Sequence, residues 1–361
     1  MAEFKTEVLR ARWKQIASVC PPKAKRTIYQ HVRIDADDAG NFILHATDGE
    51  MYVSIGDCSE PTFSRLLPVK RFSRLMEVAA AESIDLAAVT IKCGSDEWDL
   101  QSPPIDDWEF RAITDTGRQY WVEAIDLKTA LQIAQLSIDE ESTRYALGGV
   151  LLDFVGSESL AVVATDGRRM SVNQIPCECS GEPDFDVKPV VPAKTIKQIL
   201  AALKPDGRAA FSFGTTGGIV IDTGETVIYS PLVQGRFPDW SKVVPDGSGE
   251  RFNLPAGELS AALKSASIVT SDESRGVDCT LSHDGITATA TGADVGRSCA
   301  QRSLLFESEA EFRCNPEYLL PLLNKVGSDR ELCLTYTGGE APVMFSHDGG
   351  LTYVLMPLVT S

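Results

Sequence analysis

A pattern that occurs three times constrains this chain more than any other feature of its sequence. Pro68, Pro192 and Asn315 stand 124 and 123 residues apart. Each is followed by apolar residues four, seven and eight positions later, the spacing of one face of a short amphipathic helix. Proline or asparagine suits the start of such a helix. The apolar residues are Phe72, Leu75 and Met76, then Ile196, Ile199 and Leu200, then Leu319, Leu322 and Leu323.

A second helical pattern repeats near the start of each third of the chain. It begins at Leu9, Leu127 and Leu259, with apolar residues four and seven positions later. These are Trp13 and Ile16, Leu131 and Ala134, and Leu263 and Ala266. The two patterns predict six helices, two in each third. Their expected ranges are 5–17, 66–78, 127–137, 193–204, 259–268 and 316–326.

The rest of each third indicates short strands and tight turns. The run Ala46-Thr47-Asp48-Gly49 recurs as Ala164-Thr165-Asp166-Gly167, with a degenerate copy at 290–294. Asp-Gly between apolar strands favours a hairpin turn. Alternating segments predict strands at 149–154, 160–164, 218–221 and 226–229. We therefore expect an α+β fold of three repeated domains, each with two helices plus antiparallel sheets, at 1–117, 118–246 and 247–361.

Composition excludes several classes of protein. With 43% apolar and 24% charged residues, the 361-residue chain has the profile of a globular protein. No run of 18 apolar residues predicts a membrane span, and no apolar leader follows the charged N-terminus, so we expect a cytoplasmic protein. The nine cysteines are scattered and form no CxxC motif, which favours reduced, mostly buried thiols. The four histidines form no HExxH motif. We expect no metal site and no cofactor.

The charge is unevenly distributed along the chain. The formal net charge is −17, and each third is negative, so no one domain is a conventional DNA-binding module. The six predicted helices nevertheless sum to +10, which leaves −27 for the remaining residues. If all helices face one way, the protein has a cationic face and an anionic back.

Several longer segments carry a resemblance to a known family. They are Thr143–Leu151, Val163–Met170, Val190–Lys194, Leu232–Trp240 and Tyr353–Leu358. In these segments the chain resembles the bacterial sliding clamps, the beta subunits of DNA polymerase III. The resemblance runs over essentially the whole length and is weakest in the first third, where it rests on Thr47–Met51 and the surroundings of Pro68.

This resemblance implies a ring that encircles duplex DNA. Two chains would join head to tail as a homodimer, helices would line the hole, and sheets would form the outer wall. The chain would then be a non-catalytic processivity factor for DNA replication that binds DNA without reading its sequence. It would have no catalytic residues. The basic helices and acidic remainder agree with this arrangement.

The resemblance also implies a pocket for short apolar peptides of partner proteins. The expected partners are the replicative polymerase catalytic subunit, the clamp loader and repair proteins. Arg168 replaces the histidine usual in the family, and the tail ends Leu358-Val359-Thr360-Ser361. The expected lining is Leu147, Thr165, Gly167, Arg168, Arg169, Met170, Pro238, Lys242, Val243, Val354, Met356, Pro357 and Leu358.

Two further surfaces are expected. Arg26, Tyr145 and Lys194 match DNA-contacting positions of the family, and the charge of the predicted helices adds six residues. These six are Arg10, Arg12, Lys14, Arg71, Arg74 and Lys197. In the ring interface, Trp98 and Leu100 would alternate on an edge strand that faces Ile268 and Val269 of the other chain.

Two other functions compete with a DNA clamp. The acidic runs Asp37-Asp38, Asp106-Asp107 and Asp139-Glu140-Glu141 could belong to an enzyme, but no P-loop, nucleophile elbow or metal motif accompanies them. A divergent, acidic peptide-docking scaffold with the clamp fold that does not encircle DNA is the second alternative. The sparse basic content of the last third favours it.

Overall fold

Six α-helices, two in each predicted domain, occur in the part of the chain that the structure describes. The structure is a computed structural model and describes residues 3–87, 90–109, 119–141, 146–180, 188–213, 217–271, 275–292 and 295–358. All six predicted helices are confirmed, with ends shifted by a few residues. The helices are α1 (Thr6–Ile16), α2 (Val69–Val78), α3 (Ala124–Ala134), α4 (Ala193–Ala202), α5 (Ala256–Ala266) and α6 (Pro316–Val326).

The chain forms two compact units. The first unit comprises Met1–Ile125, Cys177–Pro183 and Lys194–Leu232. The second unit comprises Asp126–Pro176, Asp184–Ala193 and Val233–Ser361. The middle third of the sequence therefore contributes to both units, and the boundaries at 117 and 246 stay a prediction.

The first unit contains a nine-stranded and a four-stranded antiparallel sheet. In the larger sheet, the pairing of Tyr229 with Tyr52 joins strands from the middle and first thirds. Its spatial order is β13 (Glu178–Cys179), β9 (Tyr120–Glu123), β15 (Arg208–Phe213), β16 (Gly218–Asp222), β17 (Thr226–Pro231), β4 (Tyr52–Asp57), β3 (Phe42–Thr47), β2 (His31–Ala36) and β5 (Phe63–Pro68). The smaller sheet runs β1 (Glu3–Lys5), β6 (Ser83–Asp85), β7 (Thr90–Cys93) and β8 (Asp96–Asp99).

The second unit contains an eight-stranded and a four-stranded antiparallel sheet. Here the pairing of Met170 with Val354 joins strands from the middle and last thirds. The larger sheet runs β14 (Val190–Pro192), β10 (Gly149–Val155), β11 (Ser159–Thr165), β12 (Arg169–Pro176), β25 (Leu351–Leu355), β24 (Val343–His347), β23 (Glu331–Tyr336) and β18 (Glu250–Pro255). The smaller sheet runs β21 (Gly296–Arg302), β20 (Gly285–Gly292), β19 (Val277–Ser282) and β22 (Ala310–Cys314).

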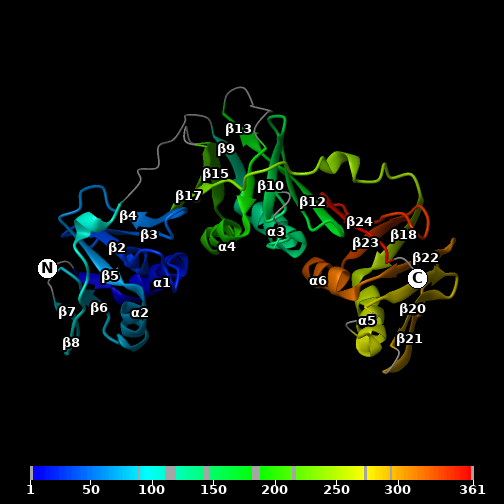
Figure 1. Cartoon of the computed structure of the whole chain (residues 1–361), viewed down its shortest axis with the longest axis horizontal. Helices are drawn as coiled ribbons and strands as arrows, with labels where there is room; N and C mark the ends of the chain where they lie inside the picture. Colours follow the sequence, from blue (N-terminus) through cyan, green and yellow to red (C-terminus); the bar gives the residue numbers. More distant parts are fainter. Residues whose placement is uncertain are drawn as a thin grey trace. The chain divides into compact units, whose positions relative to one another are not determined.

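The repeated apolar positions form the cores, as their spacing predicts. In the first unit, α1 and α2 lie side by side (Figure 1), and the Trp13 ring packs edge-on against Phe72 with ring centroids 4.4 Å apart. Trp13 Nε1 donates a hydrogen bond to Ser73 Oγ at 2.9 Å. In the second unit, α5 packs against α6, and Leu259, Leu263 and Leu319 are fully buried. Burial of these faces, more than helix propensity, holds such short helices.

The two Asp-Gly turns have the expected hairpin geometry. Gly49 lies between β3 and β4 with φ +97°, and Gly167 lies between β11 and β12 with φ +81°. Both values fall in the region that favours glycine. In each turn the preceding threonine hydroxyl accepts the glycine N–H. Among the described residues, no helix is both long enough and apolar enough to cross a membrane.

Candidate functional site

A rigid turn presents two arginines on the second unit. Thr165 Oγ1 donates to Arg169 O at 2.8 Å and accepts Gly167 N at 3.1 Å. Asp166 Oδ1 accepts the backbone N–H groups of Arg168 and Arg169, both at 2.9 Å. Because its backbone is held by these four hydrogen bonds, the turn fixes where both arginine side chains begin.

Tyr318 of α6 receives both arginine side chains. Arg168 Nη1 donates to Tyr318 Oη at 3.0 Å, and the Arg169 guanidinium stacks on the ring 4.6 Å from its centroid. The carbonyl of Tyr318 accepts the Tyr353 hydroxyl at 2.7 Å. Arg169 Nε also pairs with Asp166 at 2.9 Å. The hairpin turn and α6 are thereby joined through planar, charged contacts.

The end of β25 completes this site. Arg169 pairs with Leu355 in the sheet. Beyond the strand, Met356 N donates to Arg168 O at 2.9 Å, and Leu358 N donates to Arg313 O at 2.8 Å. The C-terminal segment therefore stays fixed to the hairpin turn and to β22.

The predicted peptide-pocket residues divide into a buried and an exposed set. Met170 and Val354 are buried in one apolar cluster, against which Phe237, Trp240 and Val244 pack. Leu147 and Thr165 are also buried. The exposed members are Gly167, Arg168, Lys242, Val243 and Met356, whereas Arg169, Pro238, Pro357 and Leu358 are half-buried. Val243 and Met356 are large apolar side chains exposed by 46% and 43%. Exposed apolar side chains that flank buried apolar ones in the sequence are what a peptide-docking surface requires.

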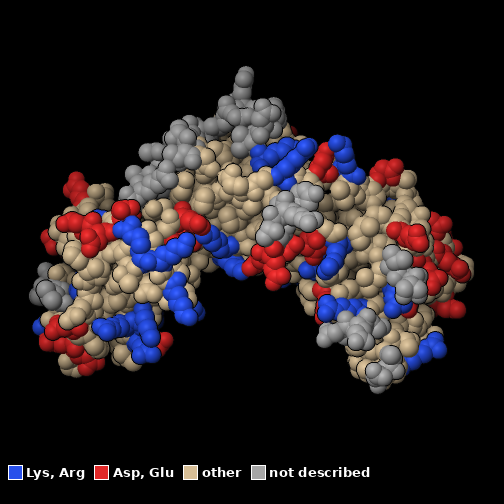
Figure 2. All heavy atoms as spheres, viewed as in Figure 1, with Lys and Arg blue, Asp and Glu red and all other residues tan. Residues whose placement is uncertain are grey.

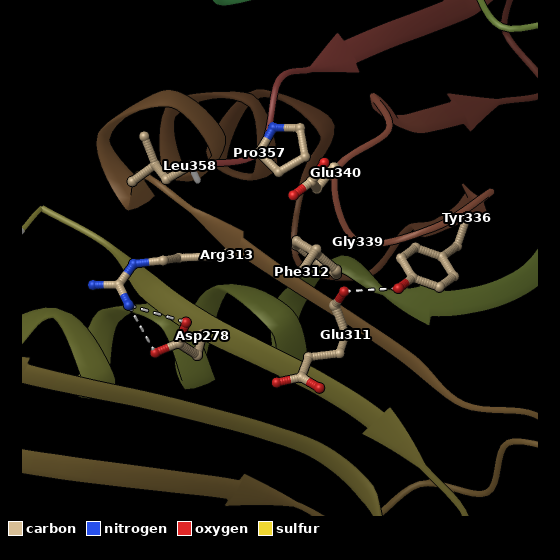
Figure 3. Close-up of a pocket in the computed structure, with 9 residues that line it drawn as sticks. All are labelled: Asp278, Glu311, Phe312, Arg313, Tyr336, Gly339, Glu340, Pro357 and Leu358. Atoms are coloured by element: carbon tan, nitrogen blue, oxygen red, sulfur yellow. Dashed lines mark hydrogen bonds and ion pairs between the residues drawn. The ribbon is translucent and has the colours of Figure 1, made fainter. Parts of the chain in front are cut away.

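A pocket of about 340 Å³ adjoins the C-terminal part of this set. Pro357 and Leu358 line it from one side (Figure 3). Across it, Arg313 Nη1 pairs with Asp278 at 3.3 Å, and the Tyr336 hydroxyl donates to Glu311 O at 2.9 Å. The residues that sequence reasoning missed here are Asp278, Glu311, Phe312, Arg313, Tyr336, Gly339 and Glu340. They come from β19, β22, β23 and the turn after β23, which only the fold brings together.

Several predicted DNA-facing residues of the first unit take part in ion pairs. Lys194 Nζ lies 2.8 Å from Asp48 and 2.7 Å from Glu50. Burial opposes the charge of Lys194, but the hydrogen bonds that it donates to both carboxylates outweigh this effect and raise the lysine pKa. Arg26 pairs with Glu109 at 3.3 Å. Tyr145 lies outside the described residues.

Arg10 and Arg12 have structural contacts within the first unit. Arg10 Nε donates to Met76 O at 2.8 Å, and Nη2 donates to the carbonyl of Ala79, so Arg10 caps the end of α2. Arg12 pairs with Glu225 at 2.9 Å and lies over the Phe42 ring. Both contacts stabilise packing within the unit.

The other four predicted DNA-facing residues are exposed. They are Lys14, Arg71, Arg74 and Lys197. Arg71 and Arg74 lie on α2 away from its buried residues Phe72, Leu75 and Met76. Figure 2 shows basic side chains gathered over the α1 and α2 side of the first unit, while acidic side chains gather near β7 and β8. The sorting of charge expected from the sequence is thus present within this unit.

One of the four predicted interface residues, Trp98, lies on the edge strand of a sheet. Trp98 is half-buried on β8, the edge strand of its four-stranded sheet. Leu100 was expected on the same strand, but β8 ends at Asp99, and Leu100 lines a groove with Phe63. Ile268 is 76% exposed, and Val269 packs against the core of the second unit.

Comparison with known proteins agrees across sequence and structure. The family model for the central domain of the DNA polymerase III beta subunit matches residues 122–239. The chain is 26% identical over 355 residues to the beta sliding clamp of Chlamydia muridarum, covering 96% of this chain and 95% of that protein. It is 24% identical over 345 residues to the beta sliding clamp of Escherichia coli, covering 88% and 91%.

Solved structures share the fold. The sliding clamp of Bartonella birtlesii superposes with a TM-score of 0.88 at 23% identity and 99% coverage of both chains. The DNA polymerase III beta subunit of Thermotoga maritima superposes with a TM-score of 0.87 at 17% identity, covering 100% of this chain and 99% of that one. Residues 122–239 thus match the central domain of the DNA polymerase III beta subunit, and along nearly its full length the chain is similar to bacterial sliding clamps in sequence and in fold.

Proposed function

We propose that this protein is a DNA polymerase processivity factor, a sliding clamp that encircles duplex DNA and tethers the replicative polymerase. The observation that carries the proposal is the match to beta sliding clamps along 96% of the chain. We infer that it acts in the cytoplasm as a non-catalytic accessory subunit. Its DNA binding would be independent of sequence, because it would rest on backbone charge and ring closure.

The DNA-facing surface would consist of exposed cations on the helices. Lys14, Arg71, Arg74 and Lys197 are exposed on α1, α2 and α4. Lys194 and Arg26 would have to exchange their carboxylate partners for phosphates. This exchange lowers the net free energy that each of them contributes to DNA binding. We therefore expect Lys14, Arg71 and Arg74 to supply most of the attraction.

Ring closure would use one edge strand of each four-stranded sheet. β8 and β21 are such edge strands, and among the described residues each pairs with a strand on one side only. Antiparallel or parallel pairing of β8 with β21 of a second copy would cover both edges. Head-to-tail joining would place Trp98 near Ile268 and Val269, and would give three domains per chain and six per ring.

The partner site would be the surface formed by the 165–170 turn, α6 and the C-terminal segment. An aliphatic or aromatic side chain of a partner peptide would contact the apolar floor at Met170 and Val354. The polymerase, the clamp loader and repair proteins would share it. Arg168, held by Tyr318, would contact the peptide backbone or an acidic side chain at the rim.

The decisive experiment measures retention on DNA before and after linearisation. The protein is loaded onto nicked circular DNA with a clamp loader, separated from free protein, and the circle is then cut. A clamp held by topology stays on the circle and leaves the linear product. Protein that never loads, or that remains equally bound to linear DNA, would contradict the proposal.

A further inference from the structure

A second pocket on the second unit has a different chemical character. It has a volume of about 280 Å³ and lies among α3, β12, α6 and the turn between β24 and β25. Its apolar floor is formed by Ile133, Ile175 and Leu351, which are exposed by only 5%, 6% and 6%. None of the residues expected to bind peptide or DNA lines it.

Basic side chains dominate the rim of this pocket. Lys325 lies in the last turn of α6, and Arg330 follows in the turn before β23. Both are exposed, and neither forms an ion pair with a carboxylate in the described part of the chain. Asp126 is the one acidic residue in the lining, so the pocket is net positive in a chain of net charge −17. A local positive site on an acidic protein favours an anionic ligand.

Both backbone groups of Arg330, its N–H and its C=O, form hydrogen bonds. Arg330 N donates to Gly327 O at 3.3 Å, and Arg330 O accepts Ala256 N at 2.9 Å. The guanidinium therefore starts from a fixed position beside the pocket. A planar fork of N–H donors on a fixed backbone suits the oxygens of a phosphoryl group.

Two polar side chains in the lining complete the site. Asn173 is buried, with 5% exposure, and its Nδ2 has no hydrogen-bond partner among the described residues. Buried amide groups are nearly always paired, so an unpaired one in a pocket wall indicates a missing ligand or water. Gly349 N donates a hydrogen bond to His347 Nδ1 at 3.1 Å, which leaves Nε2 as the ring nitrogen that can donate to a ligand.

We propose that this pocket binds the phosphoryl group of a nucleotide, either free or in a DNA backbone. Lys325 and Arg330 supply the charge, the Asn173 carboxamide and His347 supply neutral hydrogen bonds, and the apolar floor takes a compact body such as a sugar or base. The volume lies near the lower end of the range for small-molecule sites, about 300–1,000 Å³, which limits the ligand to about the size of a mononucleotide. A free nucleotide and a phosphate of the DNA backbone could both supply this group.

Calorimetric titration of the full-length protein separates these sources. The probes are deoxyadenosine monophosphate, deoxyadenosine and inorganic phosphate. The monophosphate should bind at least about tenfold more tightly than the nucleoside, because the phosphoryl group makes the charged contacts. Binding of neither phosphate-bearing probe, or equal binding of nucleotide and nucleoside, overturns the free-ligand form of the proposal.

Matched variants locate the binding. Lys325→Gln combined with Arg330→Gln should lower the affinity for the monophosphate by about tenfold or more. Lys264→Gln combined with Arg251→Gln removes the same charge from exposed positions outside the pocket and should change it by less than about twofold. If both variants lower the affinity equally, the monophosphate does not bind in this pocket and the proposal is wrong. Asn173→Ala should also lower the affinity for the monophosphate. If the alanine variant does not fold, Asn173→Ser replaces it.

A second experiment measures how tightly the same two variants bind duplex DNA. If the pocket variant weakens DNA binding more than the control variant, while free nucleotide does not bind, the phosphoryl group comes from the backbone. If neither free phosphates nor DNA distinguish the two variants, the proposal is wrong. The titrations with small phosphates need neither a closed ring nor a clamp loader, so their failure is distinct from failure of the proposed function.

Discussion

At the scale of single residues, the buried carboxylate of Asp35 shows how charge is accommodated in this fold. Asp35 lies on β2 and is 7% exposed. Arg33 Nε donates to its two oxygens at 2.8 and 3.0 Å, and His45 Nε2 lies 3.3 Å from Oδ2. Burial opposes ionisation, but the hydrogen bonds from His45 and Arg33 outweigh it and lower the pKa of Asp35 to about 2.

Asp35→Asn should therefore destabilise the protein in a pH-dependent way. The folded pKa is below the unfolded one, so the ionised carboxylate stabilises the fold above about pH 4, and this contribution is lost as the pH falls toward 2. Urea unfolding at pH 7 should show a loss of about 1–3 kcal/mol. The deficit relative to wild type should shrink as the pH approaches 2.

Asp106→Asn is the matched control, because Asp106 is exposed on the short 3-10 element η3 (Ile105–Asp107). Its unfolding free energy should stay within about 0.5 kcal/mol of wild type. A deficit in Asp35→Asn that is equal at both ends of the pH range would contradict the role given to the carboxylate charge.

At the scale of elements, the C-terminal segment after β25 shapes the proposed peptide site. Two backbone hydrogen bonds attach it, from Met356 to Arg168 and from Leu358 to Arg313. It contributes the exposed Met356 side chain and lines the pocket of Figure 3 through Pro357 and Leu358. Its removal opens the rim but leaves both sheets complete.

Deletion of 356–361 should abolish binding of a polymerase-derived peptide and leave the dimer intact. Without the apolar side chains of this segment, the peptide should bind at least about tenfold more weakly. Fluorescence anisotropy reports peptide affinity, and gel filtration with light scattering reports the dimer. Unchanged peptide affinity after the truncation would refute the assignment of the pocket.

The short 3-10 element η6 (Ser267–Val269) carries a second apolar surface. Ile268 in it is 76% exposed, an unusual position for a large aliphatic side chain that is not covered by a partner. Ile268→Glu should shift the protein from dimer to monomer with little change in thermal stability, because the side chain is not part of the core. Analytical ultracentrifugation measures the shift.

Val155→Glu tests whether any exposed apolar position would behave the same way. Val155 is 50% exposed at the end of β10, in a sheet that contains neither of the open edge strands β8 and β21. This variant should remain dimeric. If both variants, or neither, dissociate, η6 is not the interface.

At the scale of the whole molecule, the separation of charge decides how an acidic protein can hold DNA. The chain carries −17, yet the exposed face of α2 presents Arg71 and Arg74. Each cation that neutralises a phosphate releases counterions. Every such pair therefore makes the affinity for DNA fall more steeply as the salt concentration rises.

Arg71→Glu combined with Arg74→Glu should weaken duplex binding and reduce its salt dependence. The slope of log affinity against log salt should fall by about 2, one unit for each phosphate that is no longer neutralised. Anisotropy between about 50 and 200 mM salt measures it. Arg236→Glu combined with Arg251→Glu makes the same charge change at exposed positions outside the helices and should leave the slope unchanged. Equal slopes in the two variants would show that α2 is not part of the DNA-facing surface.

The sequence by itself determined the repeated elements, because they depend on local spacing. Apolar residues at helical intervals predicted all six helices, and Asp-Gly between apolar runs predicted the turns at Gly49 and Gly167. These features could be predicted because each is encoded within about twenty residues. Met170 and Val354 were assigned to the proposed peptide site through the resemblance to the sliding clamps, and the structure shows both of them buried.

Only the tertiary structure decided which distant residues act together. Arg168 meets Tyr318 across 150 positions of sequence, and Arg12 meets Glu225 across 213. The fold also showed that Arg10 caps a helix and that Asn173, Lys325 and Arg330 share a pocket. Side-chain pairing depends on how strands and helices pack after the chain has folded back on itself. Local spacing therefore predicts where a cation starts along a helix, but packing decides whether it meets a carboxylate, a carbonyl or solvent.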